Sequence, residues 1–211
     1  MIPVLAFVLS SIFVYFSYTH TQNYLKHSTL RFSELPENKQ FYVVKNIIKG
    51  VYLAILVVLG GVLLLPGVFR NEFDNFTIRI LASMYVSNDF VGLYKVSNLP
   101  TSTRVHHSAT IILLIAAWTI DFQESNVGQL LLMYTYLSTI SFPVNLYLGL
   151  RMCYEIDWLK QVSKYVYLFS CLLNWYLQYK WHEVNTYFYI YISILMLIVI
   201  DDVILLRWLW K

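Results

Sequence analysis

Two adjacent histidines, His106 and His107, open one of the apolar segments of the sequence. Imidazole gains and loses a proton near neutral pH, so it can act as a general base or attack an acyl carbonyl. Asp89 lies in the preceding apolar segment, and a carboxylate can orient a histidine ring and stabilise its charged form. We therefore expect these three residues to form a catalytic group if their helices bring them together. The alternative for the histidines is an interfacial position from which they reach lipid headgroups.

Three more polar residues interrupt apolar segments: Asn145, Asp201 and Asp202. Placing an ionisable side chain in the bilayer interior costs about 2.5–3.5 kcal/mol, so such residues usually face the inside of a helix bundle and mark a site. We expect them to join Asp89 and the histidines in one polar cavity that opens to the cytosol. Two alternatives remain open. Asn145 could satisfy backbone groups that a nearby proline frees, and the two aspartates could cap a shorter last helix.

A metal centre is the other common use of histidine, and the linear spacing does not favour one. The chain has five histidines, fewer than membrane di-iron enzymes use. Zinc needs three or four protein ligands, and no His-x-x-x-His or glutamate-rich pair supplies them. We therefore predict no metal and no other cofactor. Cys153 and Cys171 form no CxxC pattern and are interpreted as structural thiols.

The composition excludes a soluble protein. Of the 211 residues, 58% are hydrophobic and 13% are charged, whereas soluble domains have about 25% charged residues. A disordered chain is also excluded, because it needs low hydrophobicity and high net charge. The apolar runs are nearly twice as long as the strands of about ten residues in membrane barrels. We predict an all-α, polytopic transmembrane helical bundle with no nucleic-acid partner, and we attribute the net charge of +3 to topology.

Seven segments approach the length of about 20 residues that a membrane-spanning helix needs. They are Ile2 to Tyr18, Gly50 to Phe69, Ile78 to Val96, Val105 to Ile120, Gly128 to Leu150, Tyr165 to Trp181 and Thr186 to Trp208. The first, second, fifth and seventh are the strongest. The third contains several polar residues and the fourth has a short apolar run, so these two could form a re-entrant hairpin, which would leave five spans.

Basic residues predict the orientation, because they are retained on the cytoplasmic side of a membrane. Eleven of the fifteen lysines and arginines fall on one side and three on the other. The N-terminus is therefore expected outside, or in a lumen, and the C-terminus in the cytosol. The glycosylation sequon Asn75-Phe76-Thr77 lies in a loop assigned to the outside, which agrees. We interpret the first segment as a retained anchor and His20 to Asn46 as a long cytoplasmic loop.

Other classes of seven-span protein fit the sequence less well. The last segment has no lysine to form a retinal Schiff base, and no Asp-Arg-Tyr-like motif follows the third. Transporters are typically built from repeats with helices broken by Gly or Pro. Here only Pro143 breaks a helix and no internal repeat is found, so a channel or transporter stays open without support.

Three stretches together resemble the TLC-domain family, which includes ceramide synthases, translocation-associated membrane proteins and small TLC-domain proteins of lipid homeostasis. They are Tyr85-Val-Ser-Asn-Asp89-Phe, His106-His107-Ser-Ala-Thr110 and Ile140-Ser-Phe-Pro143-Val-Asn145-Leu. The resemblance runs from about Lys39 to the C-terminus. It implies a TLC-like domain over residues 39–211, preceded at 1–38 by a membrane anchor and a basic cytoplasmic loop.

The resemblance further implies a protein of the endoplasmic reticulum or a related endomembrane, whose helices surround a cavity for a lipid chain. In ceramide synthases the paired histidines are catalytic in acyl transfer from acyl-CoA to a sphingoid amine. Carried over, His106 or His107 would be the nucleophile or general base, and Asp89 the partner carboxylate. The residues expected to bind lipid or line the cavity are Tyr85, Asn88, Ser141, Asn145, Asp201 and Asp202. The expected partners are membrane lipids, with acyl-CoA as co-substrate if the chain is an enzyme.

The chain departs from the ceramide synthases in two ways. The further acidic residues that follow the paired histidines in their longer signature are absent, and so is their homeobox-like insert. Many small TLC-domain proteins also have a glutamate where this chain has Ser138. We therefore expect a small TLC-like protein that binds or senses a lipid, with an acyl-CoA-dependent acyltransferase as the alternative.

Overall fold

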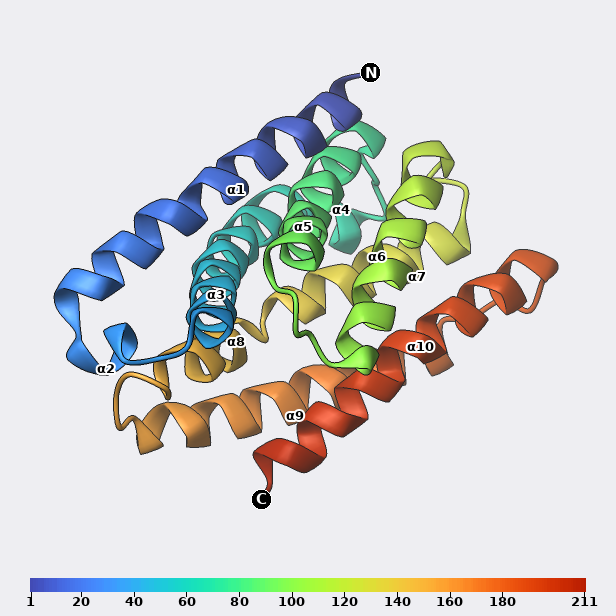
Figure 1. The fold of residues 1–211 in the computed structure, drawn as a ribbon. Coiled ribbons are helices and arrows are strands. Elements are labelled where there is room, and N and C mark those ends of the chain that lie inside the picture. Colours follow the sequence, from blue (N-terminus) through green and yellow to red (C-terminus); the bar gives the residue numbers. More distant parts are fainter.

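The computed structural model describes residues 1–211 as an all-α bundle without strands (Figure 1). Its helical segments are α1 (Ile2–Ser28), α2 (Leu30–Ser33), α3 (Glu37–Leu63), α4 (Leu65–Arg70), α5 (Asn75–Lys95), α6 (Thr101–Thr119), α7 (Asn126–Thr139), α8 (Phe142–Leu150), α9 (Asp157–Lys180) and α10 (Thr186–Leu209). The pairs α3 with α4 and α7 with α8 form continuous runs, Glu37–Arg70 and Asn126–Leu150. Counted in this way, the bundle has eight helices.

Four helices are long and apolar enough to cross a membrane: Ile2–Ser28, Glu37–Arg70, Asn126–Leu150 and Thr186–Leu209. They contain the four segments that the sequence predicts most strongly. Large hydrophobic side chains are exposed along Ile2–Ser28, Glu37–Arg70 and Thr186–Leu209, as a bilayer would require and water would not favour, whereas Asn126–Leu150 is mostly buried inside the bundle. The helical fold and these four helices confirm the prediction of an all-α, multi-pass membrane protein.

The other three predicted segments are also helical. They correspond to α5 with 21 residues, α6 with 19 and α9 with 24. At 1.5 Å per residue these helices are about 31, 28 and 36 Å long. Asp74 begins α5 by accepting hydrogen bonds from the backbone N–H groups of Phe76 and Thr77. The hydroxyl of Thr77, which donates to the same carboxylate, contributes most to holding the pKa of Asp74 below its usual value.

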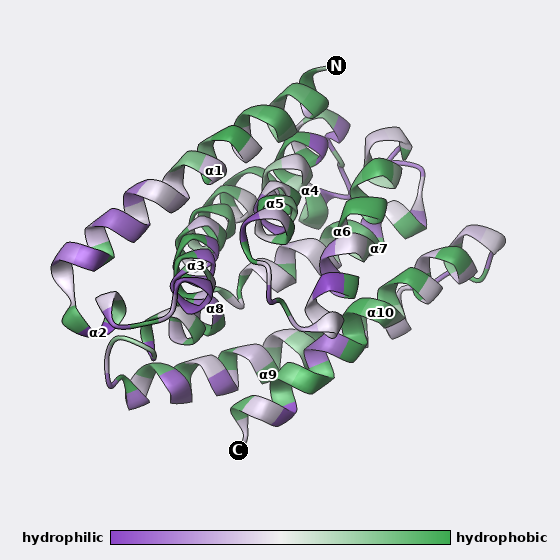
Figure 2. Ribbon diagram, viewed as in Figure 1, coloured by the Kyte–Doolittle hydropathy of each residue, from purple (hydrophilic) through white to green (hydrophobic).

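The long loop predicted from His20 to Asn46 is wrong in extent. Helix α1 continues to Ser28 and α3 already begins at Glu37, so only a short connection containing α2 remains. Figure 2 shows why the apolar pattern missed this, because the α2 end of α1 and the first turns of α3 are hydrophilic although they are helical. A hydropathy pattern follows the hydrocarbon layer, whereas the helices extend beyond it or bury polar residues among themselves.

Neighbouring helices alternate in direction along the chain. Helices α5 and α6 show this. The indole N–H of Trp118, late in α6, donates to the hydroxyl of Ser83, early in α5, at 2.9 Å. His107, early in α6, contacts Asp89, later in α5, so the two helices are antiparallel. The connections consequently collect at two ends of the bundle. At the α2 end, Arg31 forms an ion pair with Glu155 at 3.3 Å. At the other end, which we call the Asn75 end, three loops are hydrogen-bonded to one another.

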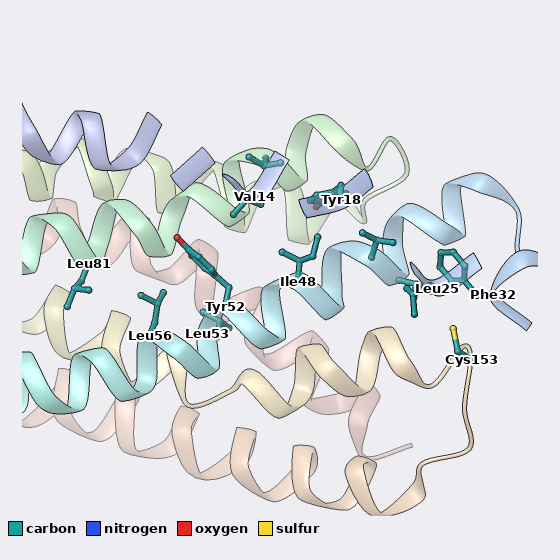
Figure 3. Packing of buried hydrophobic residues seen from close by; sticks show 13 residues of the cluster. Val14, Tyr18, Leu25, Phe32, Ile48, Tyr52, Leu53, Leu56, Leu81 and Cys153 are labelled. Atoms are coloured by element: carbon teal, nitrogen blue, oxygen red, sulfur yellow. The ribbon is translucent and has the colours of Figure 1, made fainter. Parts of the chain in front are cut away.

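A hydrophobic cluster fills the space between α1, α3 and α5 (Figure 3). Tyr18 of α1 and Leu53 of α3 are almost completely buried in it. At the α2 end the cluster includes Leu25, Phe32 and Cys153, which lie close together in Figure 3. Helix α1 is therefore packed against the bundle by its side chains over most of its length.

A ladder of side-chain hydrogen bonds joins α9 to α7. Three donors spaced four residues apart on α9 reach main-chain carbonyls of α7 in reverse order, which makes the two helices antiparallel. The bonds are Ser170 to Leu137 at 2.7 Å, Asn174 to Tyr134 at 3.2 Å and Gln178 to Leu130 at 3.0 Å. The hydroxyl of Tyr191 also donates to the Gln178 side chain at 2.9 Å, which connects α10 to the same ladder.

The fifth predicted segment, Gly128 to Leu150, is not one regular helix. Helix α7 ends at Thr139 and α8 begins at Phe142. Pro143 stands in the first turn of α8, where its missing N–H costs no helix hydrogen bond. Helix α8 packs antiparallel against α3. The two helices approach closely because glycines, Gly50 of α3 and Gly149 of α8, stand at the two contact points and have no side chain.

Gly50 and Gly61 provide a matched test of this packing on one helix. A Cβ atom on Gly50 would lie 2.6 Å from the Leu146 side chain and 2.9 Å from its backbone nitrogen, whereas one on Gly61 would meet only the Tyr136 hydroxyl at 3.4 Å. Gly50→Ala should therefore lower the free energy of unfolding by about 1–2 kcal/mol despite better helix propensity. Gly61→Ala should leave it unchanged or slightly higher. Equal stability of the two variants in denaturant titrations in mixed micelles would contradict this packing.

Candidate functional site

Asp89 of α5 is at the centre of the polar site. It is completely buried, with 0% of its surface exposed. The ammonium of Lys49, on α3, forms an ion pair with its Oδ1 atom. The Nδ1 atom of His107, on α6, lies 3.1 Å from the same oxygen, although the contact lacks the alignment of a hydrogen bond. The expected meeting of Asp89 and His107 is therefore present, with a lysine as a third member.

His106 faces a different carboxylate. Adjacent residues on a helix point about 100° apart, and the two imidazole rings meet edge to face with their centroids 5.4 Å apart. The Nδ1 atom of His106 lies 3.4 Å from Oδ2 of Asp201 on α10. His107 is only 2% exposed, so it is not an interfacial side chain that reaches the headgroups.

Asp202 is held by two tyrosines. The hydroxyl of Tyr134 donates to one carboxylate oxygen at 2.6 Å, and that of Tyr167 donates to the other at 2.7 Å. Asp201 and Asp202 both lie well inside α10, which continues to Leu209. The alternative that they cap a shorter last helix is therefore wrong. They point to different partners, as their adjacent positions on a helix require.

The histidines, Asp201, Asp202 and Lys49 line an elongated cavity of about 390 Å³, whereas Asp89, which contacts Lys49 and His107, does not line it. At the α2 end its lining includes the exposed residues Pro100 and Arg151, so the cavity opens there. The histidines, Asp201 and Asp202 lie in the same half. Towards the Asn75 end the lining is apolar, with Ile78 of α5 and Phe122, which follows α6, among its residues. The cavity thus combines a polar opening with an apolar interior.

The remaining predicted residues divide into two groups. Tyr85, Ser141 and Asn145 line the cavity. Asn145 makes no side-chain hydrogen bond, so the alternative in which it satisfies backbone groups freed by Pro143 is wrong. Asn88 does not line the cavity. It is buried on α5 and its amide has no partner.

Sequence reasoning missed Lys45 and Lys49 as site residues. Lys45 falls in the predicted loop and Lys49 directly precedes the second predicted segment, whereas both lie inside α3 and line the cavity. Their spacing of four residues, which places them on one helix face, was the available signal. Tyr134 and Tyr167 were also missed, and no feature of their sequence neighbourhood distinguishes them from other tyrosines.

The structure brings together a group that linear spacing could not reveal. Asp89, His106 and His107 each offer a potential metal-ligand atom, and these atoms lie within 4.8 Å of one another. Metal-ligand spacing within one segment cannot show this group, because its residues come from two helices, α5 and α6. Lys49 already supplies a positive charge to Asp89, so a cation bound by these three residues would have to displace its ammonium or lie beside it. Without a metal, the arrangement places two imidazoles at the wall of the cavity, and the Asp89 carboxylate contacts one of them, His107, without lining the cavity itself.

Comparisons with known proteins give no relative for this chain. No protein-family model, curated protein or solved structure matches it. The resemblance to the TLC-domain family therefore depends on the three stretches alone. The structure places them on α5, at the start of α6 and at the break between α7 and α8. Each of these stretches contributes residues to the cavity lining.

Breaking the buried ion pair should destabilise the protein strongly. Lys49→Met and Asp89→Asn should each lower the free energy of unfolding by about 3–5 kcal/mol, because each leaves one buried charge without its main partner. The double variant should lose less than the sum of the two, because it leaves neither charge behind. Denaturant titration in mixed micelles measures all four proteins, with the exposed Lys39→Met as a control. Additive losses would show that the two charges do not interact.

Proposed function

We propose that this chain is a TLC-like integral membrane protein that binds or senses a lipid in an intramembrane cavity open to the cytosol. The single observation that carries the proposal is the cavity itself. Its apolar interior fits a hydrocarbon chain, and its polar opening fits a headgroup. A pocket lined mainly by apolar side chains with a few placed polar groups is the general form of a small-molecule site.

Seven spans are proposed, three more than hydropathy supports. Helix α9 illustrates the reason, because its inner face is polar and its outer face is apolar. The buried polar residues are Ser163, Ser170, Asn174 and Gln178, and the exposed apolar or aromatic residues are Trp158, Val162, Tyr165, Phe169, Leu172, Tyr176 and Tyr179. A surface helix of a soluble protein has the opposite pattern. The alternating directions of neighbouring helices are also those that seven crossings require.

The proposed orientation places the Asn75 end outside, or in a lumen, and the α2 end in the cytosol. Basic residues gather at the α2 end, as retention on the cytoplasmic side requires. They are Lys26, Arg31, Lys39, Lys95, Arg104, Arg151, Lys160, Lys164, Arg207 and Lys211, against Arg70, Arg79 and Lys180 towards the Asn75 end. Lys45 is not counted among the loop residues because it lies inside α3. Basic residues at the α2 end still outnumber those towards the Asn75 end. The N-terminus is then outside, and the compartment proposed from the resemblance is the endoplasmic reticulum.

Filling the cavity should prevent lipid binding. Ala82 lines the cavity, whereas Ala116, on the neighbouring α6, does not. Ala82→Phe should reduce the amount of lipid that copurifies with the protein by at least about half, because the added ring occupies part of a 390 Å³ volume. Ala116→Phe should leave it unchanged. Mass spectrometry of lipid extracted per mole of protein measures both. A wild-type protein that carries no lipid and binds none when lipid is added would refute the proposal.

Acyl transfer is the second candidate, and the distance of 3.1 Å between His107 and Asp89 favours it. In this reaction an imidazole nitrogen of the histidine pair would attack the carbonyl carbon of an acyl thioester, and the CoA thiolate would leave and take up a proton. An amine or hydroxyl group would then attack the acyl-imidazole, lose its proton and release the histidine. The cytosolic opening of the cavity would suit acyl-CoA, which is delivered from that side.

The two candidates differ in what His107→Ala should do. If the chain is an acyltransferase, the reconstituted wild type consumes acyl-CoA with a sphingoid base, a lysolipid or another amine or alcohol. His107→Ala should then lower the rate by a factor of about 100 or more, while the exposed His27→Ala retains it. If the wild type consumes no acyl-CoA with any of these acceptors, the acyltransferase is excluded and lipid binding remains.

A further inference from the structure

Lys45 is the buried cation of the cavity that lacks a partner. It is 4% exposed and lines the cavity. No carboxylate oxygen lies within 4.0 Å of its ammonium, and the side chain makes no hydrogen bond. Its neighbour Lys49, one helical turn further along α3, is by contrast paired with Asp89. Burying a charge without a partner costs free energy, so the buried position of Lys45 indicates that a ligand could supply the missing partner.

The backbone of α5 holds the Lys45 side chain in place. A Cβ atom on Gly92 would lie 3.2 Å from Cε of Lys45 and 3.7 Å from its Cδ and Cγ atoms. The aliphatic part of the lysine therefore lies against the surface that this glycine leaves free. Packing of the stem directs the ammonium, the only polar part of the side chain, to the cavity.

The carboxylates that act on this half of the cavity already have partners. Asp89 pairs with Lys49, and Asp202 accepts two tyrosine hydroxyls. Asp201 has His106 at 3.4 Å. A second cation, Arg151, lies at the opening, where its guanidinium stacks on the Trp208 ring at 4.5 Å and forms no ion pair. The polar half of the cavity therefore offers two cations that no carboxylate of the chain neutralises.

We propose that the cavity takes a single-chain lipid with an anionic headgroup, a carboxylate or a phosphate monoester, whose charge is bound by Lys45 with Arg151 at the opening. This inference rests on the proposed lipid-binding function and gives its ligand class. An anion would supply the charge-assisted hydrogen bonds that Lys45 lacks. The volume of about 390 Å³ is near the lower end of the usual range of about 300–1,000 Å³ for ligand sites, which favours one chain over two.

Ligands that share one chain and differ in headgroup test this proposal. Binding to the full-length protein in a neutral detergent is compared for oleic acid, oleoyl lysophosphatidic acid, the neutral monoolein and the cationic oleylamine, with inorganic phosphate as the ligand without a chain. At least one of the two anionic lipids should bind about tenfold or more tightly than monoolein and oleylamine. Inorganic phosphate should bind far more weakly than the phosphate lipid, because it gains nothing from the apolar part of the cavity.

Three variants at two lysines of α3 locate the effect. Lys45→Met removes the charge and keeps the length of the side chain, so it should abolish the preference for the anionic lipids while monoolein binds as before. Lys45→Arg should keep the preference. Lys39→Met is the matched control, because Lys39 is exposed on the same helix and does not line the cavity. Lys45→Met removes an unpaired buried charge, so folding should not suffer, and thermal unfolding verifies this.

The outcomes separate the two proposals. Equal or tighter binding of monoolein or oleylamine would overturn the anionic ligand and leave the lipid-binding function in place. An anion preference that survives in Lys45→Met would also overturn it. Failure of every lipid to bind would refute the proposed function itself. Binding of inorganic phosphate as tight as that of the phosphate lipid would assign the site to free anions and overturn the lipid class.

Discussion

The ion pair between Lys49 and Asp89 is the interaction on which the site depends. Asp89 is completely buried, and a carboxylate in that position remains charged only with a cation beside it. Because the two residues come from α3 and α5, the pair fixes these helices relative to each other. His107 approaches the same oxygen from α6, so a third helix is positioned by the same atom. These two contacts hold α3, α5 and α6 together and place Lys49 and His107 in the cavity wall.

The sequence predicted the helices more completely than the site. All seven expected segments are helical, and the four strongest are the four that are apolar enough to cross a membrane. Asp89, His106, His107, Asp201 and Asp202 do converge, because an ionisable residue in an apolar segment must find a polar partner inside the bundle. The sequence did not predict Lys45 and Lys49 as site residues, because a hydropathy pattern places lysines near the end of an apolar segment in the loop. Whether such a lysine is buried depends on which helix packs against it, and that is a tertiary property.

Helix α9 shows a further limit of hydropathy. Averaging over all its residues combines a polar face with an apolar one, so the helix scores as weakly apolar although its exposed stripe is hydrophobic from Trp158 to Tyr179. The direction of the two faces is what matters, and it becomes visible only when α7 and α10 are placed beside it. The same reason explains the third predicted segment, where Ser83 and Asp89 lowered the apolar score and turn inward in the structure.

The ladder between α9 and α7 has a consequence for how the sequence can change. Its acceptors are main-chain carbonyls of α7, and every residue type has a carbonyl. Replacing Leu130 or Leu137 therefore removes no acceptor, whereas replacing Ser170, Asn174 or Gln178 removes a donor. Selection to keep these helices together acts on one partner only. Related sequences should keep small polar or amide residues on this face of α9 without compensating changes on α7, so covariation between the two helices would not reveal their contact.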